Sequence, residues 1–218
     1  LVIGNNVLAH VPDPLDFLQG VAVLLSENGV ASFEFPHLLN LLTLNQFDTI
    51  YHEHFSYFSV TAVKNMLERC GLRLVRVKEI PTHGGSLRIN AVPARDKGAN
   101  ATPSVDIMLA REHQAGLDSI NAYTDLQETA NRAKDDLLTF LIETKYQGEV
   151  VAGYGAAAKG NTLLNYAGVK PDLLPFVVDR NPNKVGKFLP GSRIPIFSEE
   201  ILRQVCPDFV LILPWNIA

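Results

Sequence analysis

The stretch "LVIGNNVLAHVPDPLDFLQGVAVLLSENGVASFEFP", residues 1–36, places an apolar run on each side of an amphipathic segment. Residues 1–8 are typical of a buried strand. From Asp13 or Asp16, either of which can cap a helix, apolar residues recur at helical spacing until about Ser26. Residues 30–36 form a second short apolar run, which ends at proline because proline cannot donate to a central ladder. Strand, helix and strand in this order predict a βαβ unit with parallel strands.

The next elements follow from the same patterns. Residues 60–71 predict an amphipathic helix closed by glycine. Residues 72–80 and 84–92 alternate apolar with polar side chains, as two strands joined by the turn "PTHGG" do. A polar stretch then precedes residues 105–146, which predict one or two long helices carrying many surface charges.

A second α/β unit begins at about residue 148. An apolar strand, a glycine turn and a helix ended by Gly168 are followed by a buried strand that ends at Asp179. A capped helix from Ser198 and the run "FVLILPWN" complete the chain. Strands that alternate with helices predict a small parallel sheet.

Composition and charge limit the classes of partner. The 218 residues carry a net charge of -4 and include only two cysteines, Cys70 and Cys206, whose spacing fits neither a zinc site nor a disulfide framework. An acidic chain lacks the basic face of nucleic-acid binders, and no apolar run reaches the ~20 residues of a membrane span. We therefore expect a cytoplasmic protein with free thiols and neither nucleic acid nor membrane as partner. Because the chain opens without methionine on a strand-like run, we interpret it as a fragment.

The segment "FDTIYHEHFSYFS", residues 47–59, carries the sharpest chemical signal. An imidazole titrates near ~6.5 and can take a proton at neutral pH when a carboxylate orients its other nitrogen. Tyr51, Glu53 and His54 are therefore a candidate base with its support. Two alternatives stay open: a packed or surface histidine pair, and a metal site formed by His52 and His54 with His10 or His37.

Three other polar residues are candidates for ligand binding, but each is a weak signal when taken alone. His10 follows a strand end, where open α/β sheets bind ligands, although a lone histidine is more often structural. His83 lies in "THGGSLR", whose glycines permit close approach of the backbone. Arg88 in the same motif can face a phosphate, and the alternative is an exposed strand arginine.

The motif "GYGAAAKG", residues 153–160, is a weak phosphate signal. Gly153 and Gly155 allow a tight turn before a helix whose N-terminus attracts anions, and Lys159 adds a charge. The alternative is that the glycines serve the turn alone. Asp179 follows roughly 25 residues later, as an acidic residue does in NAD-binding folds, but no hydride-transfer constellation accompanies it.

Four motifs in order carry a resemblance: "NNVLAHVPD", "FDTIYHEHFSYFS", "HGGSLR" and "GYGAAAKGNTLLNY". Together they resemble the S-adenosylmethionine-dependent sugar C-methyltransferases, such as tetronitrose C-methyltransferase, which act on nucleotide-linked hexoses. The motifs extend from Asn5 to Tyr166, and "LPWN" near the end also fits. The likeness therefore covers nearly the whole chain.

The resemblance implies an α/β fold in three parts. Residues 1–98 are expected to form the C-terminal half of a Rossmann-like methyltransferase domain, residues 99–147 a helical connector, and residues 148–218 a small C-terminal Rossmann-like α/β domain with a parallel sheet. Family members also have a cysteine-rich zinc module and a glycine-rich cofactor loop, which this sequence lacks. We therefore expect S-adenosylmethionine as cofactor of the complete enzyme, zinc only in the missing module, and no metal here.

The resemblance also implies a substrate and roles for residues. The substrate is a nucleotide-linked 4-keto-deoxy sugar, methylated on the carbon beside the ketone after that carbon loses a proton. His54 matches the family's base, with Glu53 and Tyr51 as active-site companions and His10 as a donor to the sugar or enolate oxygen. Asn6 matches the rim that lines the cofactor, and the aromatic neighbours are expected to shape a dry pocket.

Two readings compete with a catalytic fragment. The first is a nucleotide or nucleotide-sugar binding module, in which His83, Arg88, Gly153, Gly155 and Lys159 hold the ligand without chemistry. The second is the metalloprotein described above. The "YHEH" motif favours the enzyme, because a binding module has no use for a base.

Overall fold

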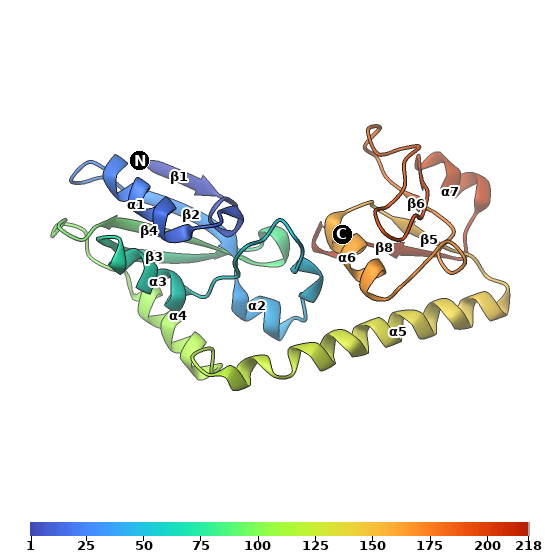
Figure 1. The fold of residues 1–218 in the computed structure, drawn as a ribbon, viewed down its shortest axis with the longest axis horizontal. Coiled ribbons are helices and arrows are strands. Elements are labelled where there is room, and N and C mark those ends of the chain that lie inside the picture. The colour runs from blue at the N-terminus through green and yellow to red at the C-terminus, as the bar shows by residue number, and fades with distance from the viewer. Residues whose placement is uncertain (218) are drawn as a thin grey trace. The chain divides into compact units, whose positions relative to one another are not determined.

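The computed structural model describes residues 1–217, and the chain divides into two compact units (Figure 1). The first unit comprises Leu1–Gln46 and His52–Asp125. The second comprises Phe47–Tyr51 and Leu126–Ala218. The short segment Phe47–Tyr51 is therefore part of the second unit, although the chain on both sides of it belongs to the first.

The first unit contains a four-stranded sheet in the order β1-β2-β4-β3. β1 and β2 are parallel, and the other two pairs are antiparallel. The strands are β1 (Val2–Asn5), β2 (Ala31–Pro36), β3 (Leu72–Ile80) and β4 (Ser86–Pro93). α1 (Pro14–Leu24) connects β1 to β2, and the Asp13 side chain caps it by accepting the N–H groups of Leu15 and Asp16 at 3.0 Å. The predicted βαβ unit and the predicted hairpin are both confirmed.

Apolar residues from the sheet and its helices form the core of this unit. Phe33 and Phe35 of β2, Ile89 of β4 and Leu67 of α3 (Val60–Arg69) are fully buried. α3 and α4 (Pro103–Gln114) both pack against β3, as Figure 1 shows. Short elements complete the unit: η1 (Leu8–His10), α2 (Leu38–Thr43), η3 (Thr82–Gly84) and η4 (Ile120–Tyr123).

The second unit contains a parallel sheet in the order β7-β6-β5-β8. Its elements are α5 (Leu126–Gln147), β5 (Val151–Tyr154), α6 (Ala158–Tyr166), β6 (Val177–Val178), β7 (Ile196–Phe197), α7 (Glu200–Val205), β8 (Phe209–Ile212) and η5 (Trp215–Ile217). η2 (Phe47–Thr49) belongs to the same unit. Numbered from β5, the strands follow the order 3-2-1-4, which is the first part of the Rossmann order. The predicted α/β class with a small parallel sheet is confirmed.

The helical stretch between the two sheets is shared by the two units. Val105 and Met108 of α4 lie in the core of the first unit. Leu141 of α5 is buried in the core of the second unit, with Leu137 and Leu138 packed beside it. Each helix therefore stabilises its own unit by burying one apolar face.

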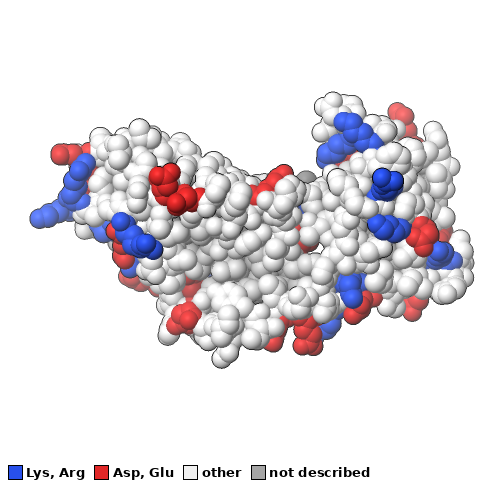
Figure 2. Space-filling view, in the orientation of Figure 1, with Lys and Arg blue, Asp and Glu red and all other residues white. Residues whose placement is uncertain are grey.

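Surface properties agree with the composition. On the face shown in Figure 2, basic and acidic side chains are interspersed rather than gathered into a field of one sign. Within residues 1–217, none of the helices combines the length and apolar character that a membrane crossing requires.

Candidate functional site

One edge of the first sheet collects most of the predicted site residues. Because β1 and β2 are parallel, their carboxyl ends, at Asn5 and Pro36, lie at the same edge. Pro36 pairs with Ser86, and Ser86 also pairs with Ile80, so the turn between β3 and β4 lies there as well. Ligands in open α/β sheets bind beyond the carboxyl ends of the strands, and this edge is therefore the candidate site.

The loop that carries the His-Glu-His motif is tied to this edge through its backbone. The N–H groups of Phe55 and Ser56 donate to the carbonyl of Ala9 at 2.8 and 3.3 Å. A little further on, the N–H of Leu38 donates to the carbonyl of Phe58 at 3.0 Å. These hydrogen bonds fix the loop beside η1 and beside the end of β2.

The result is a contact between His10 and His54. Their ring centroids are 4.8 Å apart, and both side chains are half-buried. Nδ1 of His10 lies 2.8 Å from the backbone oxygen of Glu53. Since a carbonyl oxygen only accepts, this Nδ1 carries a proton, and Nε2 of His10 faces away from that bond. Tyr57 adds an edge-on ring at 5.8 Å from the His54 centroid.

Two imidazoles in contact can divide two tasks. A ring nitrogen that carries no proton can accept one, and a ring N–H donates a hydrogen bond. These are the two roles that proton removal beside a carbonyl requires.

Asn6 and His83 meet at the same edge. Nδ2 of Asn6 lies 3.3 Å from Nε2 of His83. Because an amide nitrogen donates, His83 accepts at Nε2. Both residues have left-handed backbones, with φ of 52° and 57°. Such a conformation is uncommon outside glycine and concentrates at turns and functional sites. Residues predicted from separate motifs, one for the cofactor and one for the substrate, are thus neighbours.

Arg88 is held by a carboxylate that the sequence analysis did not select. Its guanidinium lies 2.8 Å from Glu34 of β2, whose side chain is only 6% exposed. The Thr82 hydroxyl donates to the other oxygen of Glu34 at 3.1 Å. Arg88 therefore neutralises a buried charge near the candidate site. The sequence did contain a signal for Glu34, because it is the single acidic residue inside the apolar strand "FEFP".

The remaining residues of the "YHEH" motif differ in burial and in the unit to which they belong. Tyr51 is half-buried and belongs to the second unit. The side chains of His52 and Glu53 are exposed, and the contact of Glu53 with His10 uses the backbone. The expected support of His54 by the Glu53 carboxylate stays a prediction. In the part of the chain that the structure describes, no three histidine, cysteine or carboxylate side chains converge as metal ligands.

The aromatic residues around this motif differ in burial and in their contacts, and the expected dry pocket stays a prediction. Phe58 is buried against Phe35 in the core of the first unit. Phe47 packs on Tyr166 of α6 in the second unit, and Phe55 is 60% exposed. The chain passes from one unit to the other within this segment, so neighbouring rings serve different cores.

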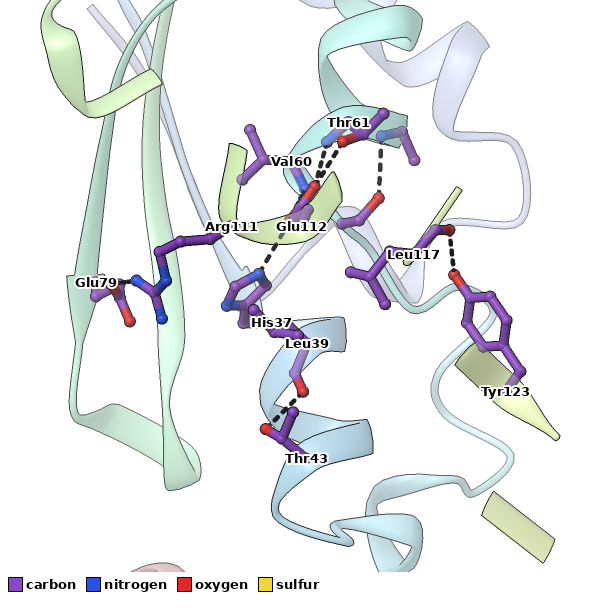
Figure 3. A network of polar contacts seen from close by, with 12 residues as sticks. His37, Leu39, Thr43, Val60, Thr61, Glu79, Arg111, Glu112, Leu117 and Tyr123 are labelled. Carbon is purple, nitrogen blue, oxygen red and sulfur yellow. Dashed lines mark hydrogen bonds and ion pairs between the residues drawn. The ribbon is translucent and has the colours of Figure 1, made fainter. Parts of the chain in front are cut away.

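A buried carboxylate behind the site was also missed. Glu112 of α4 accepts hydrogen bonds from His37 at 3.0 Å, from the N–H of Val60 at 2.6 Å, and from the N–H and hydroxyl of Thr61 at 2.8 and 2.7 Å (Figure 3). It thus caps α3 from another helix. Burial opposes ionisation of Glu112, but hydrogen bonds from His37, Thr61 and Val60 outweigh burial and lower its pKa. The sequence signal was too weak, since Glu112 is one of several charges on α4.

In the second unit, the glycines of the predicted phosphate turn make close packing contacts. A Cβ at Gly153 would lie 2.7 Å from Val177, and one at Gly155 would lie 2.6 Å from Pro214. At Gly160 the corresponding distance, to Leu213, is 2.5 Å. A packing requirement therefore accounts for these glycines, and the role of Gly153 and Gly155 in nucleotide binding stays a prediction.

The turn after Gly155 already holds a carboxylate of the chain. The N–H of Ala156 donates to Asp179 at 2.7 Å, and the Lys184 ammonium lies 3.1 Å from the same oxygen. Burial opposes ionisation of Asp179, but hydrogen bonds from Asn181, Lys184 and Ala156 outweigh it and lower the pKa. A cavity of about 360 Å³ beside Asp179 is lined by Glu199 and Glu200 as well as Arg180. This mostly acidic lining disfavours an anionic nucleotide.

Lys159, the third predicted residue of this turn, is directed elsewhere. Its ammonium lies 4.7 Å from the centroid of the Trp215 ring, within cation–π range. The indole N–H of Trp215 in turn donates to Asp48 of η2 at 2.6 Å. Lys159 is therefore part of a cluster at the start of α6, and its predicted contact with a nucleotide is untested.

Comparison with known proteins places these features in a family. Residues 81–218 match the family model described as a C-methyltransferase C-terminal domain, and residues 1–77 match a methyltransferase domain. The chain is 40% identical over its full length to C-methyltransferase NovU of Streptomyces niveus, of which it covers 52%. It thus spans about half the length of this relative.

Among solved structures, the chain is similar to a magnesium protoporphyrin IX methyltransferase from Synechocystis PCC 6803. The identity is 18%, the TM-score is 0.34, and the match covers 42% of this chain and 43% of that one. A likeness at this level supports no inference. The two family models together span both units, and the motif resemblance is confirmed: the chain belongs to the C-methyltransferase family.

Proposed function

We propose that this chain is the C-terminal part of an S-adenosylmethionine-dependent enzyme that methylates a carbon of a nucleotide-linked 4-keto-deoxy sugar. Membership of the C-methyltransferase family supports the reaction class. The observation that carries the proposal is the contact between His10 and His54 at the carboxyl edge of the first sheet. The proposal concerns the complete enzyme, because the chain spans about half of its curated relative.

The proposed chemistry assigns one task to each histidine. The carbon beside the ketone gives its proton to neutral His54, and the electron pair of the broken C–H bond forms the enolate. His10 donates a hydrogen bond to the enolate oxygen through Nε2, since its Nδ1 is bound to the backbone oxygen of Glu53. S-adenosylmethionine, when bound, supplies the methyl group that the carbanion attacks. Glu53 and Tyr51 are proposed to complete the surroundings of the base.

The residues present fit the rim of a cofactor site. Asn6 is half-buried at the end of β1, where its amide can bind polar groups of a nucleoside. No glycine-rich turn follows β1, since the sequence there is "GNNVLAH". The chain therefore supplies one side of the site, which agrees with the glycine-rich loop lying elsewhere in the complete enzyme.

Substrate contacts are proposed at the turn between β3 and β4. His83 is exposed next to Asn6, and Arg88 presents a guanidinium that is 44% exposed although it is paired with Glu34. The predicted contacts of Gly153, Gly155 and Lys159 with the nucleotide stay untested. The alternatives are close packing for the glycines and the contact with Trp215 for Lys159.

The decisive experiment is His54→Asn in the complete enzyme. In deuterated buffer without the methyl donor, the wild-type enzyme is expected to exchange the hydrogen beside the sugar ketone. The variant should lose exchange and methylation by about 10²-fold or more while the affinity for S-adenosylmethionine stays within about twofold, because a general base contributes roughly that factor. His52→Asn is the matched control, since this neighbour is exposed and should keep activity.

Three other outcomes count against the proposal. Unchanged exchange in His54→Asn removes His54 as the base. Equal loss in both variants, reversed by added metal, supports the metal alternative. Sugar binding without exchange in the wild type supports a binding module.

A further inference from the structure

The segment Phe47–Tyr51 is held by the second unit just before the chain reaches the His-Glu-His motif. η2 packs against α6, and the Phe47 ring lies 5.3 Å from the Tyr166 ring at the end of that helix. Asp48 and Thr49 are both buried. Only five residues lie between Asp48 and His54, so the position of Asp48 limits where the motif can begin.

This segment occupies the place where a Rossmann-like sheet binds its ligand. In the order β7-β6-β5-β8, the chain proceeds from β5 to β6 on one side and returns to β8 on the other. The switch point lies beyond the carboxyl ends of β5 and β8, between the start of α6 and η5. Lys159 lies in the first turn of α6, and Trp215 begins η5. Both contribute to the environment of Asp48.

The contacts of Asp48 resemble those of a bound anion. Its Oδ2 accepts the indole N–H of Trp215 at 2.6 Å, and the charge of Lys159 attracts the carboxylate. The residue is 5% exposed, and its Oδ1 has no hydrogen-bond partner among the described residues. A carboxylate beside an ammonium at a helix N-terminus is the arrangement that such sites offer to an anionic ligand.

Burial works against the charged forms of both Asp48 and Lys159. Burial raises the pKa of the Asp48 carboxyl, and the hydrogen bond from Trp215 and the charge of Lys159 oppose this only in part. Burial likewise lowers the pKa of the Lys159 ammonium, although Asp48 opposes it. Both charged forms are therefore disfavoured by their surroundings. Ionisable groups kept at such cost are more often functional than stabilising.

We propose that the ligand crevice of the second unit holds Phe47–Tyr51 as an internal ligand, and that Asp48 is a positioning residue for the catalytic motif that follows. The inference rests on the proposed role of His54. Displacing a base by about 1 Å can cost about 10²-fold in rate, so an anchor six residues away can control turnover. The second unit thereby serves the reaction through the short stretch of chain that joins Asp48 to His54.

The test uses the complete enzyme and four variants. Asp48→Ala removes the acceptor, and Trp215→Phe removes the indole N–H but keeps a ring. Asp48→Asn conserves volume and an acceptor oxygen. Asp172→Ala is the matched control, because Asp172 lies in the same unit with a side chain that is 65% exposed in a surface pair with Lys145. Hydrogen exchange of the amides of residues 47–51 measures anchoring, and kcat and KM for sugar methylation measure positioning.

Asp48→Ala and Trp215→Phe are expected to raise amide exchange at residues 47–51 by about tenfold or more. Both should lower kcat by about tenfold to 10²-fold with little change in KM, which is the signature of a misplaced base rather than of lost binding. Asp48→Asn should keep most of the slow amide exchange and most of the kcat of the wild type. Asp172→Ala should leave both quantities unchanged.

Several results would overturn the inference. Unchanged amide exchange in Asp48→Ala shows that Asp48 does not anchor the segment. Faster exchange with unchanged kcat shows that the anchor has no influence on the base. An increase in KM alone assigns Asp48 to substrate binding. If the wild-type enzyme does not methylate a sugar, the proposed function fails separately, and the exchange measurement still decides whether the segment is anchored.

Discussion

Oε1 of Glu112 lies 3.0 Å from Nε2 of His37, and both side chains are fully buried. The pair joins α4 to the end of β2, and the same carboxylate accepts the first N–H groups of α3. Three elements that are far apart in sequence thus share one buried charge behind the candidate site (Figure 3).

Removal of this carboxylate should destabilise the first unit. Glu112→Ala leaves a buried histidine and the N-terminus of α3 without a partner, so we expect a loss of about 3–5 kcal/mol in the free energy of unfolding. Glu79→Ala is the control, since Glu79 pairs with Arg111 of the same helix but its side chain is 47% exposed. This exposed pair should contribute only about 0–1 kcal/mol. Urea denaturation measures both, and equal losses would contradict the assignment.

Glu112 also predicts a dependence of stability on pH. Its folded-state pKa lies below its ordinary value of 4.5. The stabilisation is therefore fully present above that ordinary value and is lost as the pH falls through the lowered folded pKa. Thermal unfolding between pH 7 and pH 3 should show this loss in the wild type. Glu112→Gln should lack this component of the pH dependence. If stability falls equally with pH in the two proteins, Glu112 is not its source.

Replacement of two helix glycines by alanine should change the stability of the protein in opposite directions. At Gly160 of α6, a Cβ would lie 2.5 Å from Leu213, so Gly160→Ala should destabilise the second unit by about 1–3 kcal/mol. At Gly20 of α1, apart from the adjoining residues and the nearby backbone of the helix itself, no atom of the described residues lies within 4 Å of an added Cβ. Gly20→Ala should therefore stabilise the protein by about 0.5–1 kcal/mol through helix propensity. Calorimetry of both variants tests the pair, and the same sign in both would refute the packing argument.

Variants of Arg88 and Glu34 can distinguish a structural role of Arg88 from a role in substrate binding. Arg88→Met leaves the buried Glu34 carboxylate without its counter-ion and should lower stability by about 1–2 kcal/mol. The double variant with Glu34→Gln should recover most of this loss. Arg76→Met on the same sheet is the exposed control, expected to change stability by less than about 0.5 kcal/mol.

The kinetic properties of these variants then test Arg88 itself. If Arg88 contacts the substrate as proposed, KM should rise in the stable double variant and stay unchanged in Glu34→Gln alone. An unchanged KM in the double variant would assign Arg88 to charge compensation alone.

Much of the fold follows from local pattern. The alternation in residues 72–80 and 84–92 gave the β3–β4 hairpin, and the helical spacing after Asp13 gave α1. These signals are readable because each depends on residues close together in the chain. The helices between residues 103 and 147 were also visible, but their attachment to different cores was not, since both carry similar weak periodicity.

The candidate site was predictable only as separate motifs. The sequence placed His10 and His54 at strand ends or loops but gave no distance between them. The contact depends on hydrogen bonds from Phe55 and Ser56 to Ala9. Glu34, Asp48 and Glu112 were missed. Only Glu34 carried a signal, as the single acidic residue of an apolar strand, because a buried carboxylate and an exposed one otherwise look alike in a sequence.

The sequence by itself determined the α/β class, the order of the elements and the family, because periodicity and motif spacing are local properties of the chain. The tertiary structure alone decided which imidazoles meet, which carboxylates are buried, and that Phe47–Tyr51 belongs to the second unit. These outcomes depend on contacts between residues far apart in the chain. Their energies come from desolvation and charge pairing, which exist only once the chain has folded.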